Sequence, residues 1–283
     1  MKLYKSLVDY IKVNNLENIK VTNDCMAWVE YPEYNFIYNK LWLANSQDIE
    51  AGPMGVYPIS YPVIFKPIIN LFGMSRGFKI INNEEEYNEN IKDGFFWEKY
   101  LDGKHNCIDL IIQEGEIKFV SALESFSDGK GGFIYHTSIP DFELPEHIIF
   151  WLKLYFGDYT GCLNIETING LIIEGHLRLN GDFHLYNLDF AKHLNSFYFD
   201  KKWSFNFNIK KTYLLPIFVK KEFKIENLDN LKNKIIEILG KNNIETFYQD
   251  DINSNCQSEW KSRLFMFEIK HFNFELIKKI KKL

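Results

Sequence analysis

The order of apolar and polar residues predicts short strands and one helix in the first third of the chain. Residues 61–68 (YPVIFKPI) and 77–81 (GFKII) are β-branched and aromatic runs, which are typical of strands. Residues 82–91 (NNEEEYNENI) are polar and compatible with a helix, and 94–101 (GFFWEKYL) return to strand character. The expected order is therefore strand, glycine-bearing turn, strand, helix, strand.

From His105 onward the pattern predicts antiparallel strands. Residues 106–112 and 117–125 are extended runs separated by a turn that contains glycine, and a polar loop is expected over 126–138. Residues 145–157 (PEHIIFWLKLYFG) have apolar residues at helical spacing, with proline at the expected start and glycine at the expected end. A helix is therefore predicted between this loop and the next strands.

The segment 163–182 (LNIETINGLIIEGHLRLNGD) predicts a hairpin, because two apolar runs are joined by Asn-Gly, the strongest short hairpin signal. Residues two apart in a strand share a face, so Glu174, His176 and Arg178 are expected on one side, with Ile173 and Leu177 on the other. The turn brings Glu166 back across from them. Two carboxylates, an imidazole and a guanidinium are thus predicted to converge.

The two ends of the chain have weaker patterns. A helix is expected over residues 2–13, and an irregular aromatic region over 27–58. Residues 201–283 are expected to form a C-terminal α+β module. Within that module the pattern predicts strand, helix, strand, strand and helix at 213–220, 227–241, 244–249, 262–272 and 274–283.

Composition indicates a folded protein with a large core and excludes few functions. The 283 residues are 46% hydrophobic and 17% aromatic, which is ample for one large domain or two modest ones. A net charge of −5 gives no support to a nucleic-acid partner. The N-terminus lacks the continuous apolar core of a signal peptide, and no stretch reaches the length of a membrane span. A cytoplasmic protein is expected, and a host cell's cytosol or a virus particle would fit the same facts.

The four cysteines do not suggest a zinc site or a disulfide framework, because no two of them have CxxC spacing. Free thiols in a reducing compartment are expected. The cysteines are Cys25, Cys107, Cys162 and Cys256.

The predicted hairpin has two interpretations. Clustered carboxylates raise each other's pKa unless a cation lies between them, and Mg²⁺ with substrate phosphates suits such a place, where Arg178 would bind the remaining phosphate charge. The alternative is a solvated strand face with paired Glu and Arg. The first interpretation gains from Lys66, at the end of an apolar strand, followed by a loop whose Gly73 and Gly77 allow close approach of a ligand.

The stretches YPVIFKP, GMSRG and EKYL, followed by the hairpin, resemble in this order the ATP-grasp superfamily of carboxylate–amine ligases, in particular biotin carboxylases and carbamoyl phosphate synthetases. The resemblance covers about Tyr61 to Asp182. It implies an α+β chain with the ATP-grasp fold, in which two α+β subdomains enclose a nucleotide. The implied parts are a short N-terminal region (1–60), a small subdomain (61–102), a large subdomain with the metal hairpin (103–200) and the C-terminal module (201–283).

The same resemblance implies roles for residues in the first half of the chain. Lys66 would contact the ATP phosphates, and His105 would face the nucleotide. The glycine-rich loop would cover the phosphates through Gly73, Ser75 and Gly77. The adenine edge would be read near Glu98, Lys99, Tyr100 and Leu101.

In the hairpin, the resemblance implies Mg²⁺ ligands at Glu166 and Glu174, and an arginine that stabilises transferred phosphate at Arg178. His176 departs from the family, which normally has asparagine there, so this side chain is expected to hydrogen-bond a phosphate or to favour Mn²⁺. Lys130, on the loop SDGKGGF, is expected either to meet a substrate carboxylate or the γ-phosphate, or to belong to a surface loop only.

The implied function is an ATP- and Mg²⁺-dependent ligase that activates a substrate carboxylate as an acyl phosphate for attack by an amine or similar nucleophile. The expected partner is a small-molecule or peptide carboxylate, with neither nucleic acid nor membrane. The C-terminal module is expected to cap the ATP site, to form a homo-oligomer interface or to recruit a partner. The alternative is a catalytically degenerate ATP-grasp-like protein that serves as a nucleotide-binding or interaction scaffold, which His176, the thin glycine loop and the short N-terminal region favour.

Overall fold

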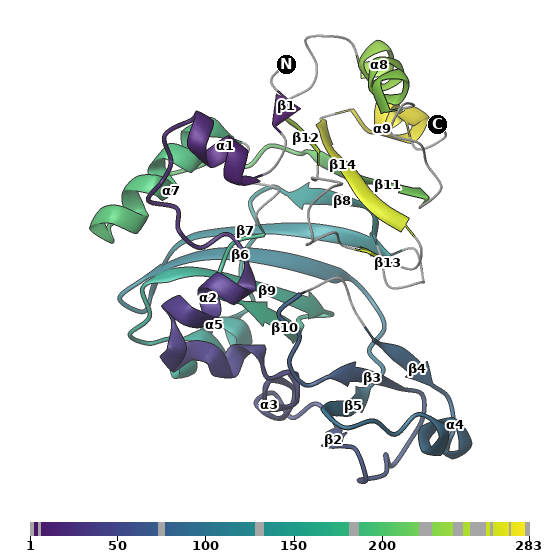
Figure 1. Cartoon of the computed structure of the whole chain (residues 1–283). Helices are drawn as coiled ribbons and strands as arrows, with labels where there is room; N and C mark the ends of the chain where they lie inside the picture. The colour runs from purple at the N-terminus through teal and green to yellow at the C-terminus, as the bar shows by residue number, and fades with distance from the viewer. Residues whose placement is uncertain are drawn as a thin grey trace.

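The chain folds around two β-sheets of unequal size (Figure 1). The computed structural model describes residues 3–4, 7–72, 77–127, 133–180, 187–220, 228–239, 246–249, 259–260, 263–271 and 273–280. The mixture of helices with mostly antiparallel strands confirms the expected α+β class. None of the helices in these ranges is long and apolar enough to cross a membrane.

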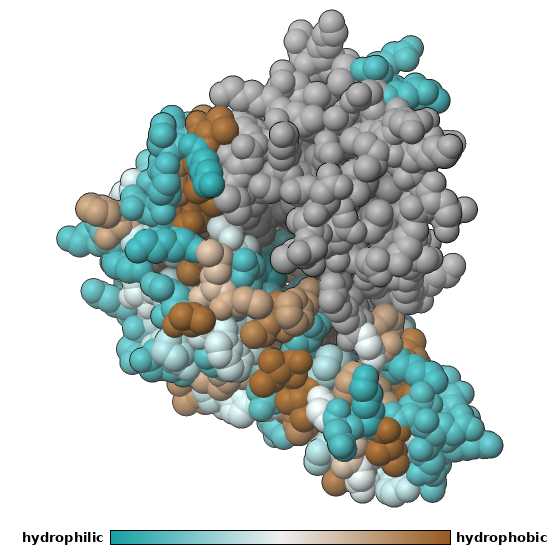
Figure 2. All heavy atoms as spheres, viewed as in Figure 1, coloured by the Kyte–Doolittle hydropathy of each residue, from teal (hydrophilic) through white to brown (hydrophobic). Residues whose placement is uncertain are grey.

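The small sheet forms a lobe of its own at the lower right of Figure 1. Its strands and helix follow the predicted order of strand, turn, strand, helix and strand. A buried cluster that includes Phe65, Tyr87 and Trp97 holds α4 against the sheet, and Figure 2 shows hydrophilic residues over much of the outer surface of this lobe. In spatial order the strands are β2 (Ala51–Pro53), β5 (Phe95–Lys99), β3 (Val63–Pro67) and β4 (Lys79–Ile81), and the helix is α4 (Glu84–Glu89).

The large sheet runs through the rest of the molecule and includes strands from both ends of the chain. All of its neighbouring strands are antiparallel except β1 and β12. In spatial order its strands are β1 (Leu3–Tyr4), β12 (Thr246–Gln249), β14 (Arg263–His271), β11 (Tyr213–Lys220), β8 (Phe133–Ile139), β7 (Glu116–Ser127), β6 (His105–Gln113), β9 (Gly161–Ile168) and β10 (Leu171–His176), and β13 (Glu259–Trp260) pairs with β14.

Helices cover both faces of the large sheet around β6 and β9. On one face, Ile108 and Leu110 share a buried cluster with residues of α2, η1, α3 and α5. On the other face, Ile111 and Phe119 share a second cluster with residues of α1 and α7. The helices are α1 (Leu7–Val13), α2 (Asp24–Glu30), the 3₁₀-helix η1 (Pro32–Tyr38), α3 (Lys40–Asn45), α5 (Glu146–Tyr155), α7 (Leu188–Asp200), α8 (Leu228–Leu239) and α9 (Phe274–Ile280).

The prediction of an irregular region over 27–58 is wrong, because this region contains helices that pack on the large sheet. Two asparagine caps start the helices that flank η1. Asn23 accepts a hydrogen bond from the backbone N–H of Met26 at 2.9 Å, and Asn39 accepts one from Trp42 at 3.0 Å. The loop expected over 126–138 is also partly wrong, since residues from Phe133 form β8.

The Asn-Gly hairpin is confirmed, and its turn also holds the linker between the two sheets. Asn169 and Gly170 have φ values of 49° and 84°, as a tight hairpin turn requires. The Asn169 side chain donates to the carbonyl of Asp102 at 2.6 Å and accepts from the N–H of Lys104 at 3.1 Å. At Gly103, φ is 130° and an added Cβ would lie 2.1 Å from the Asn169 side chain, so glycine is required there.

Candidate functional site

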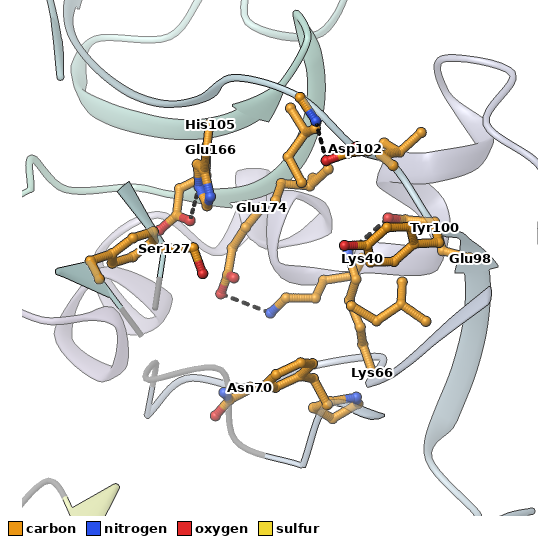
Figure 3. Close-up of a pocket in the computed structure, with 18 residues that line it drawn as sticks. Lys40, Lys66, Asn70, Glu98, Tyr100, Asp102, His105, Ser127, Glu166 and Glu174 are labelled. Atoms are coloured by element: carbon orange, nitrogen blue, oxygen red, sulfur yellow. Dashed lines mark hydrogen bonds and ion pairs between the residues drawn. The ribbon is translucent and has the colours of Figure 1, made fainter. Parts of the chain in front are cut away.

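A cavity of about 250 Å³ lies between the small sheet and the β6–β9–β10 edge of the large sheet (Figure 3). This volume is close to the lower end of the range for small-molecule sites, about 300 Å³. Seven of the residues singled out from the sequence line it together. They are Lys66, Glu98, Tyr100, Leu101, His105, Glu166 and Glu174.

The small-sheet wall carries a buried ion pair. Lys66 on β3 lies 2.8 Å from Oε1 of Glu98 on β5, and the two residues are only 8% and 2% exposed. The other oxygen of Glu98, Oε2, is buried and has no hydrogen-bond partner among the described residues. An unpaired buried acceptor costs about 1–3 kcal/mol. A ligand that donates a hydrogen bond to Glu98 would remove that cost.

The linker and the ends of the strands supply the apolar part of the cavity. Tyr100 and Leu101 come from the linker after β5, and Ile64 and Ile173 come from β3 and β10. The two side-chain hydrogen bonds of Asn169 hold the linker against the hairpin turn. A flat apolar group could therefore lie beside the linker, close to the unpaired oxygen of Glu98.

The large-sheet wall brings two carboxylates together. Glu174 on β10 is the direct cross-strand partner of Glu166 on β9. Nε2 of His105 donates to Oε2 of Glu166 at 2.9 Å. Burial by itself would raise the pKa of Glu166, but the hydrogen bond and charge of His105, with the charges of His176 and Lys40, lower that pKa to about 2. Glu166 is therefore ionised at neutral pH.

Lys40 is a site residue that the sequence did not reveal. It is the first residue of α3, it is 6% exposed, and its Nζ lies 2.8 Å from Oε1 of Glu174. Figure 3 shows the two side chains pointing toward each other inside the cavity. A cation at the start of a helix is unfavourable to the helix dipole, so a lysine directly after an asparagine cap was the available signal.

Asp24 is the second site residue missed from the sequence, and it holds both His176 and Arg178. Its Oδ1 accepts from Nδ1 of His176 at 3.1 Å, and its Oδ2 accepts from Nη2 of Arg178 at 2.9 Å. Burial raises the pKa of Asp24, but the charges of His176 and Arg178 and their hydrogen bonds lower it well below its usual range. Asp24 is thus a buried carboxylate with two basic partners.

The prediction that Glu174, His176 and Arg178 share one strand face, with Ile173 on the other, is wrong. The register between β9 and β10 is irregular between Ile172 and Glu174, so Ile173 and Glu174 both line the cavity. Strand β10 ends at His176, and Arg178 lies in the bend that follows. Arg178 does not belong to the lining of the cavity, and it also donates to the carbonyl of Leu179 at 3.1 Å.

The donor atoms at this wall fit a divalent cation. Ligand atoms of Glu166, Glu174 and His176 all lie within 4.8 Å of one another, and a second such group, His105, Cys107 and Glu166, shares Glu166. Octahedral ligands at about 2.1 Å from an ion are about 3.0 Å apart when adjacent and about 4.2 Å apart when opposite. Side-chain movements that bring the three atoms of the first group closer together would give that geometry, so these residues could hold the ion.

The remaining predicted residues lie apart from the cavity lining or outside the described part of the chain. Gly77 is exposed with φ of 79°, and Lys99 is exposed at the end of β5. Gly73, Ser75 and Lys130 lie outside the described residues, so their roles stay predictions.

No protein-family model and no curated protein matches the sequence. Solved structures do match across most of the chain at low identity. A carboxyaminoimidazole ribonucleotide synthase from Aspergillus clavatus complexed with ATP has 10% identity and a TM-score of 0.63, covering 96% of this chain and 77% of that one. An L-amino acid ligase from Bacillus licheniformis has 12% identity and a TM-score of 0.60, covering 91% and 71%.

A third structure, the N5-carboxyaminoimidazole synthetase from Staphylococcus aureus complexed with ADP, has 14% identity and a TM-score of 0.61, covering 87% of this chain and 70% of that one. All three are ATP-grasp proteins. At identities this low the structural matches show the fold alone. The fold that they show agrees with the order of motifs found in the sequence. The chain therefore has the ATP-grasp fold.

Proposed function

We propose that the cavity binds ATP and that the protein is an ATP- and divalent-metal-dependent ligase. One observation carries the proposal. Two cation–carboxylate pairs, the buried pair Lys66–Glu98 and the pair of buried Lys40 with half-buried Glu174, lie in one cavity between the two sheets of an ATP-grasp fold. Two of the similar proteins were crystallised with ATP or ADP, which supports a nucleotide as the ligand.

The adenine is proposed to lie beside the linker. Its 6-amino group would donate to Oε2 of Glu98, the buried acceptor with no partner among the described residues. Tyr100, Leu101 and Ile173 would provide apolar contacts to the ring. A base with a carbonyl at the corresponding position would face the same oxygen acceptor to acceptor, so the site should prefer adenine to guanine.

The phosphates are proposed to lie between the two lysines and the paired glutamates. Lys66 and Lys40 would bind the phosphate oxygens as positive charges. Glu166 and Glu174 would hold the divalent cation, which when bound neutralises phosphate charge. Because the two lysines are buried and all four side chains are already paired, little reorganisation would be needed when the nucleotide binds.

The proposed reaction proceeds in two balanced steps. A carboxylate oxygen of the substrate attacks the γ-phosphorus and ADP leaves, which gives an acyl phosphate. An amine or similar nucleophile then attacks the acyl carbon, its proton is lost, and inorganic phosphate leaves. The L-amino acid ligase among the similar structures supports a small-molecule carboxylate as the substrate class. We also propose that the two subdomains that enclose the nucleotide are residues 61–102 and 103–200.

A second candidate is a nucleotide-binding protein without turnover, and one observation favours it. Arg178, the residue expected to stabilise transferred phosphate, donates to Asp24 and to the carbonyl of Leu179, and it is not part of the cavity lining. Turnover would require this guanidinium to leave Asp24, or another cation to take its role.

Calorimetric titration with ATP, ADP and GTP in the presence of Mg²⁺ or Mn²⁺ tests the proposal. We expect ATP and ADP to bind and GTP to bind at least about tenfold more weakly. Absence of ATP and ADP binding would overturn the assignment of the site. ADP release measured over a panel of carboxylates and amines then separates the ligase, which turns over with one pair, from the second candidate, which binds ATP and releases no ADP.

Glu174→Gln provides the matching variant. Loss of one negative charge next to the phosphates should weaken metal–nucleotide binding and remove turnover, since the amide keeps the size of the side chain and lacks its charge. Glu143→Gln, at an exposed position, is the control and should bind ATP as the native protein does. Equal binding and turnover by the native protein and Glu174→Gln would contradict the metal assignment.

A further inference from the structure

His176 is buried at the point where the large-sheet wall of the cavity meets α2. It is 4% exposed, and it lies between two carboxylates. Its Nδ1 is 3.1 Å from Oδ1 of Asp24, and its Nε2 is 3.7 Å from Oε1 of Glu174. The two ring nitrogens therefore face different environments: Nδ1 faces the buried carboxylate of Asp24, and Nε2 faces Glu174 of the proposed metal site.

Asp24 fixes which nitrogen carries the proton. An ionised carboxylate only accepts hydrogen bonds, so the Nδ1 that faces it must be the N–H donor. A metal binds the neutral form of the ring, and in that form the lone pair is on Nε2, which lies 3.7 Å from Oε1 of Glu174. A carboxylate that accepts from one ring nitrogen while the other binds a metal is the usual arrangement around metal-binding histidines.

Asp24 is itself held in place. Its second oxygen, Oδ2, accepts from Nη2 of Arg178 at 2.9 Å, and the hydroxyl of Tyr38 lies 3.4 Å from Oδ1. Asp24 is 3% exposed, so water cannot readily replace these contacts. Arg178 thereby acts on the site through Asp24, and Asp24 keeps the imidazole in one orientation.

The resulting set of donors contains nitrogen as well as oxygen. Glu166 and Glu174 contribute carboxylate oxygens, and a ring nitrogen of His176 lies within 4.8 Å of both. Nε2 of that ring is 3.7 Å from Oε1 of Glu174. His105 and Cys107 form a second group around the same Glu166. Mg²⁺ prefers oxygen ligands alone, whereas imidazole suits first-row transition metals, whose affinity for such sites exceeds that of Mg²⁺.

We propose that the divalent-metal site of this cavity includes Nε2 of His176 as a ligand and selects a first-row transition metal over Mg²⁺, with Asp24 as the residue that positions the imidazole. The proposal rests on the proposed function only for the location of the site. It concerns this chain's own side chains, and metal binding without nucleotide is enough to examine it.

Titration of the full chain with Co²⁺ alone and with Mg²⁺ alone, each repeated with ADP present, measures the selectivity. We expect tighter binding of Co²⁺ than of Mg²⁺ by the native protein. His176→Asn replaces the imidazole by an amide oxygen and should weaken Co²⁺ binding at least about tenfold, with Mg²⁺ binding changed less than about threefold. His193→Asn, an exposed histidine that stacks on Phe205, should leave both affinities unchanged.

Asp24→Asn tests the positioning role. It removes the acceptor-only partner, so the ring is free to take the other tautomer, and Co²⁺ binding should fall by about 10–100-fold, the usual cost of losing such a partner. Because this variant also loses the carboxylate that accepts from Arg178, its fold is checked by circular dichroism. If it fails to fold, the native protein and His176→Asn decide the question.

Pulsed EPR of the Mn²⁺ complex gives an independent readout, because a bound imidazole produces ¹⁴N coupling to the metal. The coupling is expected in the native protein and in His193→Asn, and it should be lost or reduced in His176→Asn. An unchanged signal in His176→Asn, or equal losses of Co²⁺ and Mg²⁺ affinity, would overturn the proposal. Nitrogen coupling without any ADP binding would instead uphold this metal site and contradict the proposed nucleotide function.

Discussion

At the scale of single residues, the site consists of buried charges that each have an opposite partner close by. A buried charge without a partner costs several kcal/mol, so the position of one charged side chain predicts that another lies near it. Lys66 and Glu98 are 32 residues apart, whereas His176 and Asp24 are 152 apart. Sequence patterns identify a pair such as Lys66 and Glu98 more readily, because these two residues are close in the sequence and belong to neighbouring strands.

Lys40 illustrates how one residue can affect two ligands in opposite directions. In Lys40→Met the long apolar stem is kept and the charge next to Glu174 is lost. We expect nucleotide affinity to fall at least about tenfold, because a phosphate would lose a buried cation. Affinity for Mn²⁺ alone should rise several-fold, because Glu174 no longer has a competing positive charge 2.8 Å away. Calorimetry with ATP and with Mn²⁺ measures both.

Lys153→Met serves as the control, since Lys153 is exposed on α5 and is not part of the cavity lining. It should change neither affinity. A parallel fall of nucleotide and metal affinity in Lys40→Met would mean that Lys40 supports the fold of the site and does not itself bind phosphate.

At the scale of elements, the sequence pattern predicts the strands, helices and turns whose formation depends mainly on residues close together in the chain. The strands of the small sheet, the helix at 145–157 and the Asn-Gly hairpin follow from alternation, caps and turn residues, and they are confirmed. The helices between 24 and 45 were missed because aromatic residues there, such as Trp42, pack against partners far along the chain. The β10 irregularity at Ile172 was missed for a similar reason: the Gln47 side chain from beyond α3 hydrogen-bonds both the N–H and the carbonyl of Ile172.

The contact between the hairpin turn and the linker predicts the effect of a single methyl group. In Gly103→Ala the added Cβ would lie 2.1 Å from the Asn169 side chain, so the hydrogen bonds from Asn169 to the linker must break or shift. We expect lower unfolding free energy, by about 2 kcal/mol or more, and weaker ATP binding because Tyr100 and Leu101 move with the linker. Urea denaturation and calorimetry measure the two effects.

Gly94→Ala separates backbone strain from the collision. Gly94 also has positive φ, at 76°, but an added Cβ there meets no atom within 4 Å. It should cost about 1 kcal/mol and leave ATP affinity unchanged. If Asn169→Ala relieves most of the loss in Gly103→Ala, the two residues are coupled as described; additive losses would contradict that coupling.

At the scale of the whole molecule, the site depends on segments that are separate in the sequence. The N-terminal region contributes Lys40 to the cavity lining, Asp24 as the partner of His176 and Arg178, and β2 to the small sheet. The β3-to-β10 half of the site could be predicted, because its motifs follow one another and resemble a known family. The other half depends on how the helices after residue 24 pack on the large sheet, which no local pattern records.

The large sheet also contains a buried carboxyl group whose ionisation should affect the stability of the whole molecule. Asp109 on β6 is 3% exposed, and its Oδ1 accepts from Asn164 at 2.9 Å and from the N–H of Asn180 at 2.7 Å. Burial raises the pKa of Asp109 from 3.8 to about 7, although these hydrogen bonds and the charges of Arg178 and His176 act to lower it. The folded protein therefore holds a proton at Asp109 that the unfolded chain releases near pH 4.

This difference predicts the sign of a pH effect. Between pH 4 and pH 7 the folded state binds more protons at Asp109 than the unfolded state does, so its contribution to the unfolding free energy is fully present below pH 4 and is lost as pH rises to about 7. The loss is of the order of 1.4 kcal/mol per unit of pKa difference.

Asp109→Asn tests this effect, because asparagine keeps the oxygen that accepts both hydrogen bonds and cannot ionise. The variant should be more stable than the native protein, by a margin in unfolding free energy that grows from pH 4 to pH 7 and then stays constant. Urea denaturation at several pH values measures the margin, with Asp93→Asn at an exposed position as the control. A margin that does not change with pH would mean that Asp109 is ionised in the folded protein and stabilised there by Arg178 and His176.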